Sequence, residues 1–148
     1  LFEAACQLGA VLSGKPGLES SLAQFGRELG AAFQVADDVL DYTADAETLG
    51  KNIGDDLAEG KPTLPLILGR KLLADDGKEI IDQAIREGGI DRMEEIVSLV
   101  RACGALDMTR EAAISRAAAA KTAIVALPGS EWKDAMETLA SYSVSRDY

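Results

Sequence analysis

Three aspartates, Asp37, Asp38 and Asp41, are the residues whose types and spacing point most directly to chemistry. On a helix, Asp37 and Asp41 share one face and Asp38 lies about 100° round from Asp37, so we expect the three carboxylates to converge on one point. Mg²⁺ takes oxygen ligands and is usually held by one or two carboxylates together with substrate phosphates. The pattern therefore predicts a site for Mg²⁺ against a diphosphate.

The alternative explanation is a solvated acidic face, which is the commoner origin of a run of charges. Apolar neighbours such as Phe33 and Leu40 weaken it, because they put the cluster at the edge of a buried stripe. A calcium-binding EF-hand loop needs acids at alternate positions and glycine at the sixth. The segment Asp41–Ala46 has neither, so we set calcium aside.

Two lysines, Lys51 and Lys61, follow the aspartates, and each comes directly after a glycine. Lysine is a flexible point charge that suits phosphate oxygens, although a single exposed Gly-Lys pair is usually only a turn. Asp56 lies between the two lysines in the sequence. We expect it to orient a metal-bound water or to hold one of the lysines in place.

Helices must position these residues, because the chain is 47% apolar with only 5% aromatic residues and contains the alanine run Ala117–Ala120. We predict an all-α fold in which residues 1–148 form a single segment of one domain. Apolar spacing, caps and breakers predict helices over 1–12, 18–42, 61–73, 78–86, 90–102, 109–127 and from 130 onward, with a functional loop over 43–60. Thr109 and Ser130 are the expected starts of the last two.

Composition excludes several other classes of function. The chain has 15 Lys and Arg against 25 Asp and Glu, a net charge of -10, which argues against a nucleic-acid partner. It has no histidine, so the usual general base and transition-metal ligand are missing. Cys6 and Cys103 are expected to be core thiols in a reducing compartment. No apolar stretch approaches the roughly 20 residues that span a bilayer, so we expect no transmembrane segment.

The sequence around the aspartates resembles a known family. The matching stretches are residues 30–41, Gly50-Lys51, Gly54, Asp56-Leu57 and residues 60–65. Together they resemble the second aspartate-rich region of the trans-prenyl diphosphate synthases, and this extended match is far more specific than a bare DDxxD. Residues 103–110 and 139–146 are similar to the C-terminal helices of the members that make longer chains such as octaprenyl diphosphate.

The resemblance implies the C-terminal half of the isoprenoid-synthase helical bundle, with Mg²⁺ as cofactor. It also implies a role for each matching polar or aromatic residue: Asp37, Asp38 and Asp41 as metal ligands, Asp56 supporting them, Lys51, Lys61 and Gln34 binding substrate, and Phe33 with Gln34 at the reacting atoms. The implied reaction is ionisation of an allylic prenyl diphosphate, attack by isopentenyl diphosphate and loss of a proton, in the biosynthesis of isoprenoids such as quinone side chains. Without histidine, metal ions and positioning must do this work.

The sequence also departs from that family. It has one DDxxD motif, and it lacks the first aspartate motif and the arginine pair that follows it. The pattern that begins at Leu1 is typical of a helix interior, so we expect the chain to be part of a longer protein. We expect it to be inactive alone. We also expect it to associate as a homodimer through exposed apolar surface. We expect a cytoplasmic location, and contact with the periphery of the membrane that receives the product stays open.

Two other hypotheses are kept. In the first, the chain is a non-catalytic, synthase-like subunit that heterodimerises with a prenyl synthase and modulates it. The intact DDxxD and both lysines argue against this, because a structural subunit does not need them. In the second, the chain is a plain helical scaffold with an acidic face and no ligand.

Overall fold

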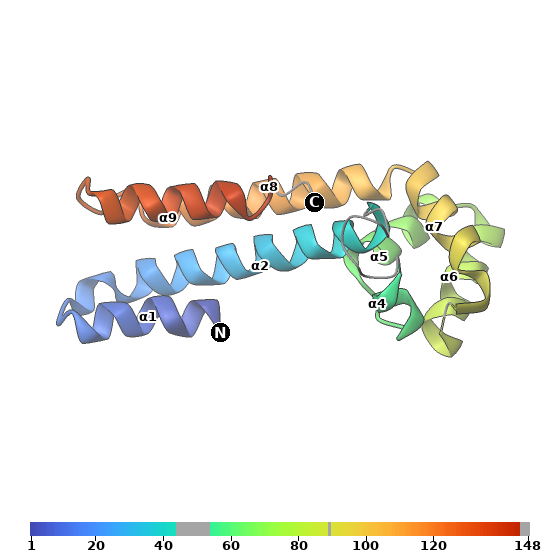
Figure 1. Cartoon of the computed structure of the whole chain (residues 1–148), viewed down its shortest axis with the longest axis horizontal. Coiled ribbons are helices and arrows are strands. Elements are labelled where there is room, and N and C mark those ends of the chain that lie inside the picture. The colour runs from blue at the N-terminus through green and yellow to red at the C-terminus, as the bar shows by residue number, and fades with distance from the viewer. Residues whose placement is uncertain (44–53, 89, 146–148) are drawn as a thin grey trace. The chain divides into compact units, whose positions relative to one another are not determined.

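The structure, a computed structural model, describes residues 1–43, 54–88 and 90–145. These residues form helices and turns with no strand among them, which confirms the all-α class (Figure 1). They divide into two compact units: the bundle unit, residues 1–36 with 111–145, and the site unit, residues 37–110. That the whole chain is a single segment of one domain stays a prediction.

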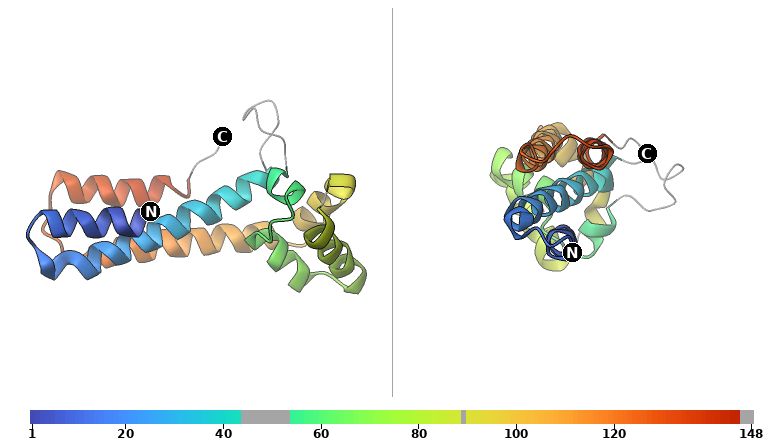
Figure 2. Two further views of the ribbon diagram at one scale, coloured as in Figure 1. Left: turned by 90° about the horizontal axis from the view of Figure 1, so that it is seen from below. Right: turned by 90° about the vertical axis from the view of Figure 1, so that its left-hand side faces the viewer.

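The bundle unit is built from helices that lie side by side (Figures 1 and 2). They are α1 (Phe2–Leu12), the short 3-10 helix η1 (Pro16–Leu18), most of α2 (Glu19–Thr43), the later part of α8 (Ala105–Ala123) and α9 (Glu131–Tyr142). Helix α1 packs tightly on α2 at Gly26, where an added Cβ would lie 2.5 Å from the carbonyl oxygen of Phe2. The core of the unit contains Phe25, Leu29 and Ile124.

The site unit holds the remaining helices. They are α4 (Asp55–Ala58), α5 (Leu64–Leu72), α6 (Asp75–Glu87), the 3-10 helix η2 (Ile90–Arg92) and α7 (Met93–Ala102), with the last turns of α2 and the first turns of α8. Fully buried large side chains form its core: Tyr42, Leu57, Leu66, Ile81, Ile96 and Val100. This core joins the end of α2 to α4, α5, α6 and α7.

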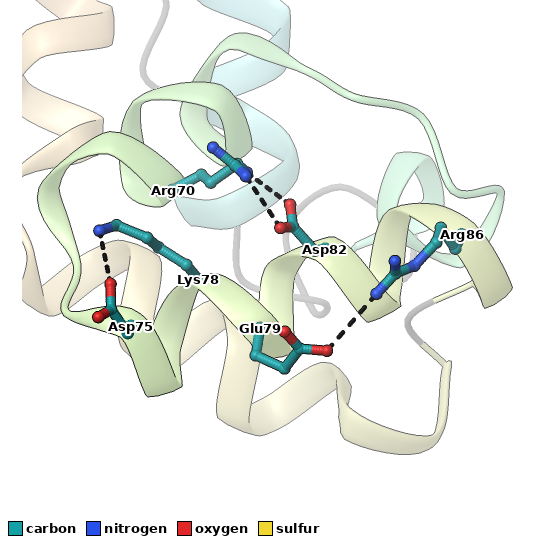
Figure 3. A network of polar contacts seen from close by, with 6 residues as sticks. All are labelled: Arg70, Asp75, Lys78, Glu79, Asp82 and Arg86. Carbon is teal, nitrogen blue, oxygen red and sulfur yellow. Dashed lines mark hydrogen bonds and ion pairs between the residues drawn. The ribbon is translucent and has the colours of Figure 1, made fainter.

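Ion pairs line the surface of α5 and α6 (Figure 3). Arg70 reaches from α5 to Asp82 of α6 with Nε 2.5 Å from Oδ1. Within α6, Lys78 pairs with Asp75 at 3.0 Å and Arg86 with Glu79 at 3.6 Å. All of these side chains except that of Asp82 are more than a third exposed, so each pair adds little to stability.

Helix boundaries agree with the sequence where strong local signals set them. Ser130 precedes α9 as predicted, and its hydroxyl accepts a hydrogen bond from the Lys133 N–H at 3.2 Å. The expectation for Thr109 is wrong. Helix α8 begins at Ala105, and Thr109 is buried one turn inside it, where its hydroxyl donates to the Ala105 carbonyl at 2.7 Å. Gly104, with φ of +83°, makes the turn between α7 and α8.

Other boundaries also differ from expectation: α5 begins at Leu64 instead of Lys61, and α8 ends at Ala123 instead of Leu127. The predicted loop over 43–60 contains α4 at residues 55–58, while residues 44–53 lie outside the described part of the chain. Helix α6 starts at Asp75 instead of Lys78, because two aspartates in its first turn suit the positive end of the helix dipole. Of the helices described here, none combines the length and the apolar character needed to cross a bilayer.

Candidate functional site

The three predicted metal ligands occupy the last two turns of α2, which ends at Thr43. The C-terminal end of a helix is the negative end of its dipole, where carboxylates are disfavoured. Asp37, Asp38 and Asp41 therefore do not help the helix that carries them. Other parts of the site unit must compensate for their charge.

Asp38 is compensated by the start of α5. Its side chain is nearly buried, with the residue 8% exposed, and its Oδ2 accepts a hydrogen bond from the Leu64 N–H at 3.3 Å. Thr63 occupies the N-cap position of α5, yet its own side chain makes no capping hydrogen bond. Asp38 thus does the work of a cap from another helix, and the positive end of α5 faces its carboxylate.

Asp41 is compensated in the same way by α4. Its Oδ2 accepts from the Asp56 N–H at 3.3 Å, and its backbone carbonyl accepts from the Gly54 N–H at 3.1 Å. Gly54 has φ of +83°, and an added Cβ there would lie 2.1 Å from the sulfur of Met93. Only glycine fits this position, so the sequence itself ties the start of α4 to the end of α2.

Burial raises the pKa of Asp41 above the ordinary value for aspartate. The negative charge of Asp56 raises that pKa further, while the backbone N–H groups of Asp56 and Asp55 oppose the shift. The carboxylate is therefore held in a place that disfavours its charge. A nearby cation would relieve this cost.

Asp37 differs from its two neighbours. It is partly exposed, and no residue within 1–43, 54–88 or 90–145 forms a hydrogen bond or ion pair with its carboxylate. Among the described residues, therefore, both oxygens of the Asp37 carboxylate lack a partner. Asp37 is the member of the cluster best placed to meet a ligand directly.

The expected convergence of three carboxylates on one point is not found. Among the described residues no group of three or more His, Cys, Asp or Glu side chains is arranged to hold a metal ion. The reason is that Asp38 and Asp41 are turned to different backbone donors, on α5 and on α4. The donors still suit Mg²⁺, which needs only one or two carboxylates when phosphate oxygens and water complete its shell.

Lys61 brings the cationic group of the site. Its Nζ lies 2.8 Å from Oδ1 of Asp56 and 2.8 Å from Oε2 of Glu59, and these two acids raise the pKa of the ammonium group above its usual range. Lys61 is therefore charged at any physiological pH and half exposed. Of the two roles expected for Asp56, the structure shows the holding of a lysine. Lys51 lies outside the described residues.

Phe33 and Gln34 lie on α2, one turn before Asp37, within the bundle unit. Both are on the exposed side of the helix, and the ring of Phe33 contacts that of Phe2 with centroids 5.7 Å apart. Their predicted roles at the reacting atoms stay predictions.

Arg101 and Tyr42 belong to the site unit's polar framework, although no sequence signal singled them out. The Arg101 guanidinium donates to the Tyr42 carbonyl from Nε at 2.9 Å and from Nη2 at 2.6 Å, across 59 residues of sequence. A cation at the last carbonyls of α2 offsets the negative end of the helix. Tyr42 itself is fully buried beside the carboxylates.

A scan against family models matches residues 1–101 to the polyprenyl synthetase family. Among curated relatives, the octaprenyl diphosphate synthase of Escherichia coli is 45% identical over 149 residues, which cover 99% of this chain and 46% of that protein. The all-trans-nonaprenyl-diphosphate synthase of Rhodobacter capsulatus is 42% identical and is covered to 45% of its length. The chain thus spans about half the length of these relatives.

Solved structures agree with this result. A polyprenyl synthase from Caulobacter crescentus, complexed with calcium and isoprenyl diphosphate, superposes with a TM-score of 0.88 and 42% identity, over 98% of this chain and 45% of that one. A geranylgeranyl pyrophosphate synthetase from Pyrococcus horikoshii gives a TM-score of 0.86 at 30% identity, over 99% of this chain and 45% of that one.

Proposed function

Because this chain belongs to the polyprenyl synthetase family, we propose that it is part of a Mg²⁺-dependent trans-prenyltransferase that adds isopentenyl diphosphate to an allylic prenyl diphosphate. The observation that supports this best is the set of three aspartates at the end of α2 where a helix disfavours negative charge. Two of the relatives described above are named for octaprenyl and nonaprenyl products. We therefore propose a long-chain product, such as the octaprenyl side chain of a quinone, on the basis of the similarity to these two relatives.

In this proposal the chain supplies one half of the substrate site. Asp37, whose carboxylate has no partner among the described residues, would hold Mg²⁺, and Asp38 and Asp41 would serve as further ligands if their carboxylates turned from their backbone donors. When bound, Mg²⁺ supplies positive charge that stabilises the departing diphosphate. Lys61, with Lys51, grips the diphosphate of the allylic substrate, and Asp56 keeps Lys61 in place through its ion pair. Phe33 and Gln34 line the reaction site.

The proposal includes the state of the isolated chain. Since it spans about half the length of its relatives, the 148 residues should bind diphosphate with Mg²⁺ but not catalyse transfer alone.

Large apolar side chains are strongly exposed on the bundle unit, among them Leu12 at 85%, Val125 at 70% and Trp132 at 75%. We propose that a second copy covers such residues in a homodimer, which a mass measurement in solution tests. A cytoplasmic location stays a prediction.

Calorimetric titration of the chain with geranyl diphosphate, with and without MgCl₂, tests the function. We expect binding that requires Mg²⁺, together with no product when isopentenyl diphosphate is added. Asp76→Ala is a matched control, because Asp76 is an exposed aspartate in the first turn of α6. Absence of Mg²⁺-dependent binding would contradict the proposed function. Robust turnover by the chain alone would contradict the expectation that the isolated chain is inactive.

The same titration separates the alternatives. A helical scaffold with no ligand would show no metal-dependent heat, and substitution of Asp37 would change nothing. A non-catalytic subunit that only modulates a synthase would bind that synthase but would not need Lys61. Lys61 is paired with Asp56, whose N–H donates to Asp41, and this link to the acidic cluster favours the catalytic assignment.

A further inference from the structure

Lys61 is surrounded by more negative charge than it can balance. Its Nζ lies 2.8 Å from Oδ1 of Asp56 and 2.8 Å from Oε2 of Glu59, so one positive charge faces two carboxylates. The group of three therefore repels an anion when taken as a whole. One of the two carboxylates must move away before Lys61 can offer its full charge to a phosphate oxygen.

Asp56 is the partner that is held in place. Its N–H donates to Oδ2 of Asp41 at 3.3 Å, and its carbonyl accepts from the Lys61 N–H at 2.9 Å. The side chain is 24% exposed and belongs to α4, which is anchored by the fully buried Leu57. Asp56 is thus fixed on both sides by its backbone, and its carboxylate is the lasting partner of Lys61.

Glu59 is the partner that is free to leave. It is the C-cap residue of α4, and its side chain is 65% exposed. Within the described part of the chain, Lys61 is the only group that pairs with its carboxylate. An exposed pair between two long side chains contributes little, because water screens the charges and both side chains lose conformational freedom. The contact of Glu59 with Lys61 is therefore easily exchanged for another.

The turn between the two residues is fixed, so this exchange needs no change of the backbone. Gly60 donates its N–H to the Leu57 carbonyl at 3.0 Å and has φ of +68°, which favours glycine. An added Cβ at Gly60 would lie 3.1 Å from the carbonyl oxygen of Ile85 on α6. Rotation of exposed side chains, which takes picoseconds to nanoseconds, is enough to part Glu59 from Lys61.

We propose that Glu59 competes with the diphosphate for Lys61: it pairs with the lysine in the unliganded protein, yields its place to a phosphate oxygen on binding, and returns when the diphosphate leaves. Asp56 stays paired with Lys61 throughout. This inference rests on the proposed function. Its consequence is that Glu59 lowers the affinity for diphosphate and speeds its release, which suits a reaction in which a diphosphate must depart in every cycle.

Calorimetric titration of the 148-residue chain with inorganic diphosphate in MgCl₂ tests the competition. Glu59→Gln should tighten binding about two- to fivefold, the range expected when an exposed ion pair no longer competes. Glu79→Gln is the matched control, because it removes an exposed glutamate that pairs with Arg86 on α6 (Figure 3), and it should bind as wild type does. Equal affinities of wild type and Glu59→Gln would overturn the inference.

A second background separates competition from simple repulsion of the anion by Glu59. In Lys61→Ala, the change Glu59→Gln should alter the affinity less than it does in the wild-type chain, because there is no lysine for it to release. The same gain in both backgrounds would show that Glu59 acts only through its charge, and would overturn the competition.

The carboxyl carbon signals of Glu59 and Asp56 in NMR spectra show which acid leaves. Addition of diphosphate with Mg²⁺ should move the Glu59 signal to the position that it has in unliganded Lys61→Ala. A Glu59 signal that stays in place while the wild type binds would overturn this inference alone. Failure of the wild type to bind diphosphate at all would overturn the proposed function, and this inference with it.

Discussion

Two sets of aspartates in the site unit show how differently one residue type is used. On α6, Asp75 and Asp82 lie at or near the surface, each paired with a lysine or arginine side chain that lowers its pKa (Figure 3). On α2, Asp38 and Asp41 are buried or half-buried and accept hydrogen bonds from backbone N–H groups of other helices. Burial raises the pKa of Asp41.

The difference supports the proposal that the α2 set, and not the α6 set, binds a ligand. The α6 carboxylates already have their cations, so a metal ion would have to displace an ammonium or guanidinium group. The α2 carboxylates are held in place by helix starts, which orient them without cancelling their full charge. The described lysine that follows them most closely in the sequence, Lys61, is paired with Asp56 and Glu59 instead. A divalent cation would balance the negative charge of the α2 aspartates.

The largest expected effect comes from Asp37→Ala. Removing the most available carboxylate should weaken Mg²⁺-dependent binding of geranyl diphosphate by on the order of 100-fold. Because Asp37 makes no described hydrogen bond, the unfolding midpoint should stay the same. Calorimetry and denaturant unfolding measure the two quantities, with Asp76→Ala as control. Equal losses in the two variants would show that Asp37 contributes no more to binding than an exposed aspartate on α6.

Lys61→Ala should have the next largest effect. Loss of one point charge should weaken diphosphate binding about tenfold and leave the affinity for Mg²⁺ alone unchanged. Lys78→Ala is the matched control, because it removes a lysine that pairs with Asp75 on α6. If both variants bind equally well, Lys61 has no role at the diphosphate.

Asp38 allows charge and hydrogen bonding to be separated. Asp38→Ala should cost about 1 kcal/mol of unfolding free energy, as the loss of an N-cap does, because the Leu64 N–H loses its acceptor. Asp38→Asn keeps an acceptor oxygen and should be nearly as stable as wild type, yet it should bind Mg²⁺ and diphosphate as poorly as the alanine variant. An asparagine variant with full binding would show that Asp38 only caps α5.

The smallest effect concerns pH and the surface pair of Asp82 with Arg70. The guanidinium of Arg70 lowers the pKa of Asp82, so ionisation of this carboxyl favours the folded state. The stabilising contribution is present above the pKa of an unperturbed aspartate, 3.8, and is lost as the pH falls through the lower folded value. Asp82→Asn should therefore be slightly less stable than wild type at neutral pH, and thermal unfolding should show the gap closing as the pH falls below 3.8.

The contribution of Asp41 to stability should change with pH in the opposite direction to that of Asp82. Its raised pKa means that ionisation opposes folding, so its unfavourable contribution is present at neutral pH and disappears as the carboxyl becomes protonated. Asp41→Asn should leave the chain as stable as wild type or more so at neutral pH. A lower midpoint for Asp41→Asn than for Asp82→Asn would contradict the comparison of the two sets.

The sequence predicted the features that depend on neighbours along the chain. Helix α9 was placed correctly because Ser130 is a local cap, and the three aspartates were placed on a helix by its apolar spacing. Thr109 was misread because a threonine inside a helix can satisfy its hydroxyl on a carbonyl four residues back. A cap and an interior threonine look alike when neither end of the helix is known.

The sequence could not show contacts that depend on tertiary packing. The Asp38 carboxylate and the Leu64 N–H are 26 residues apart, and Arg101 is 59 residues from Tyr42. No local pattern indicates such pairs. The hydrogen bonds of Asp38 with Leu64 and of Asp41 with Asp56 turn these two carboxylates to different donors, although helix geometry alone had suggested that they would converge. The position of the three aspartates on a helix was therefore predictable, but the hydrogen-bond partner of each carboxylate was not.

Paramagnetic broadening by Mn²⁺, which replaces Mg²⁺ at oxygen sites, tests the central claim most directly. In the presence of diphosphate, low concentrations of Mn²⁺ should broaden the amide signals of residues 37–41 first and leave those of residues 75–82 sharp. Asp37→Ala should remove that selectivity. Equal broadening of the two segments in the wild-type chain, or broadening confined to α6, would contradict the assignment of the α2 aspartates as the metal and diphosphate site.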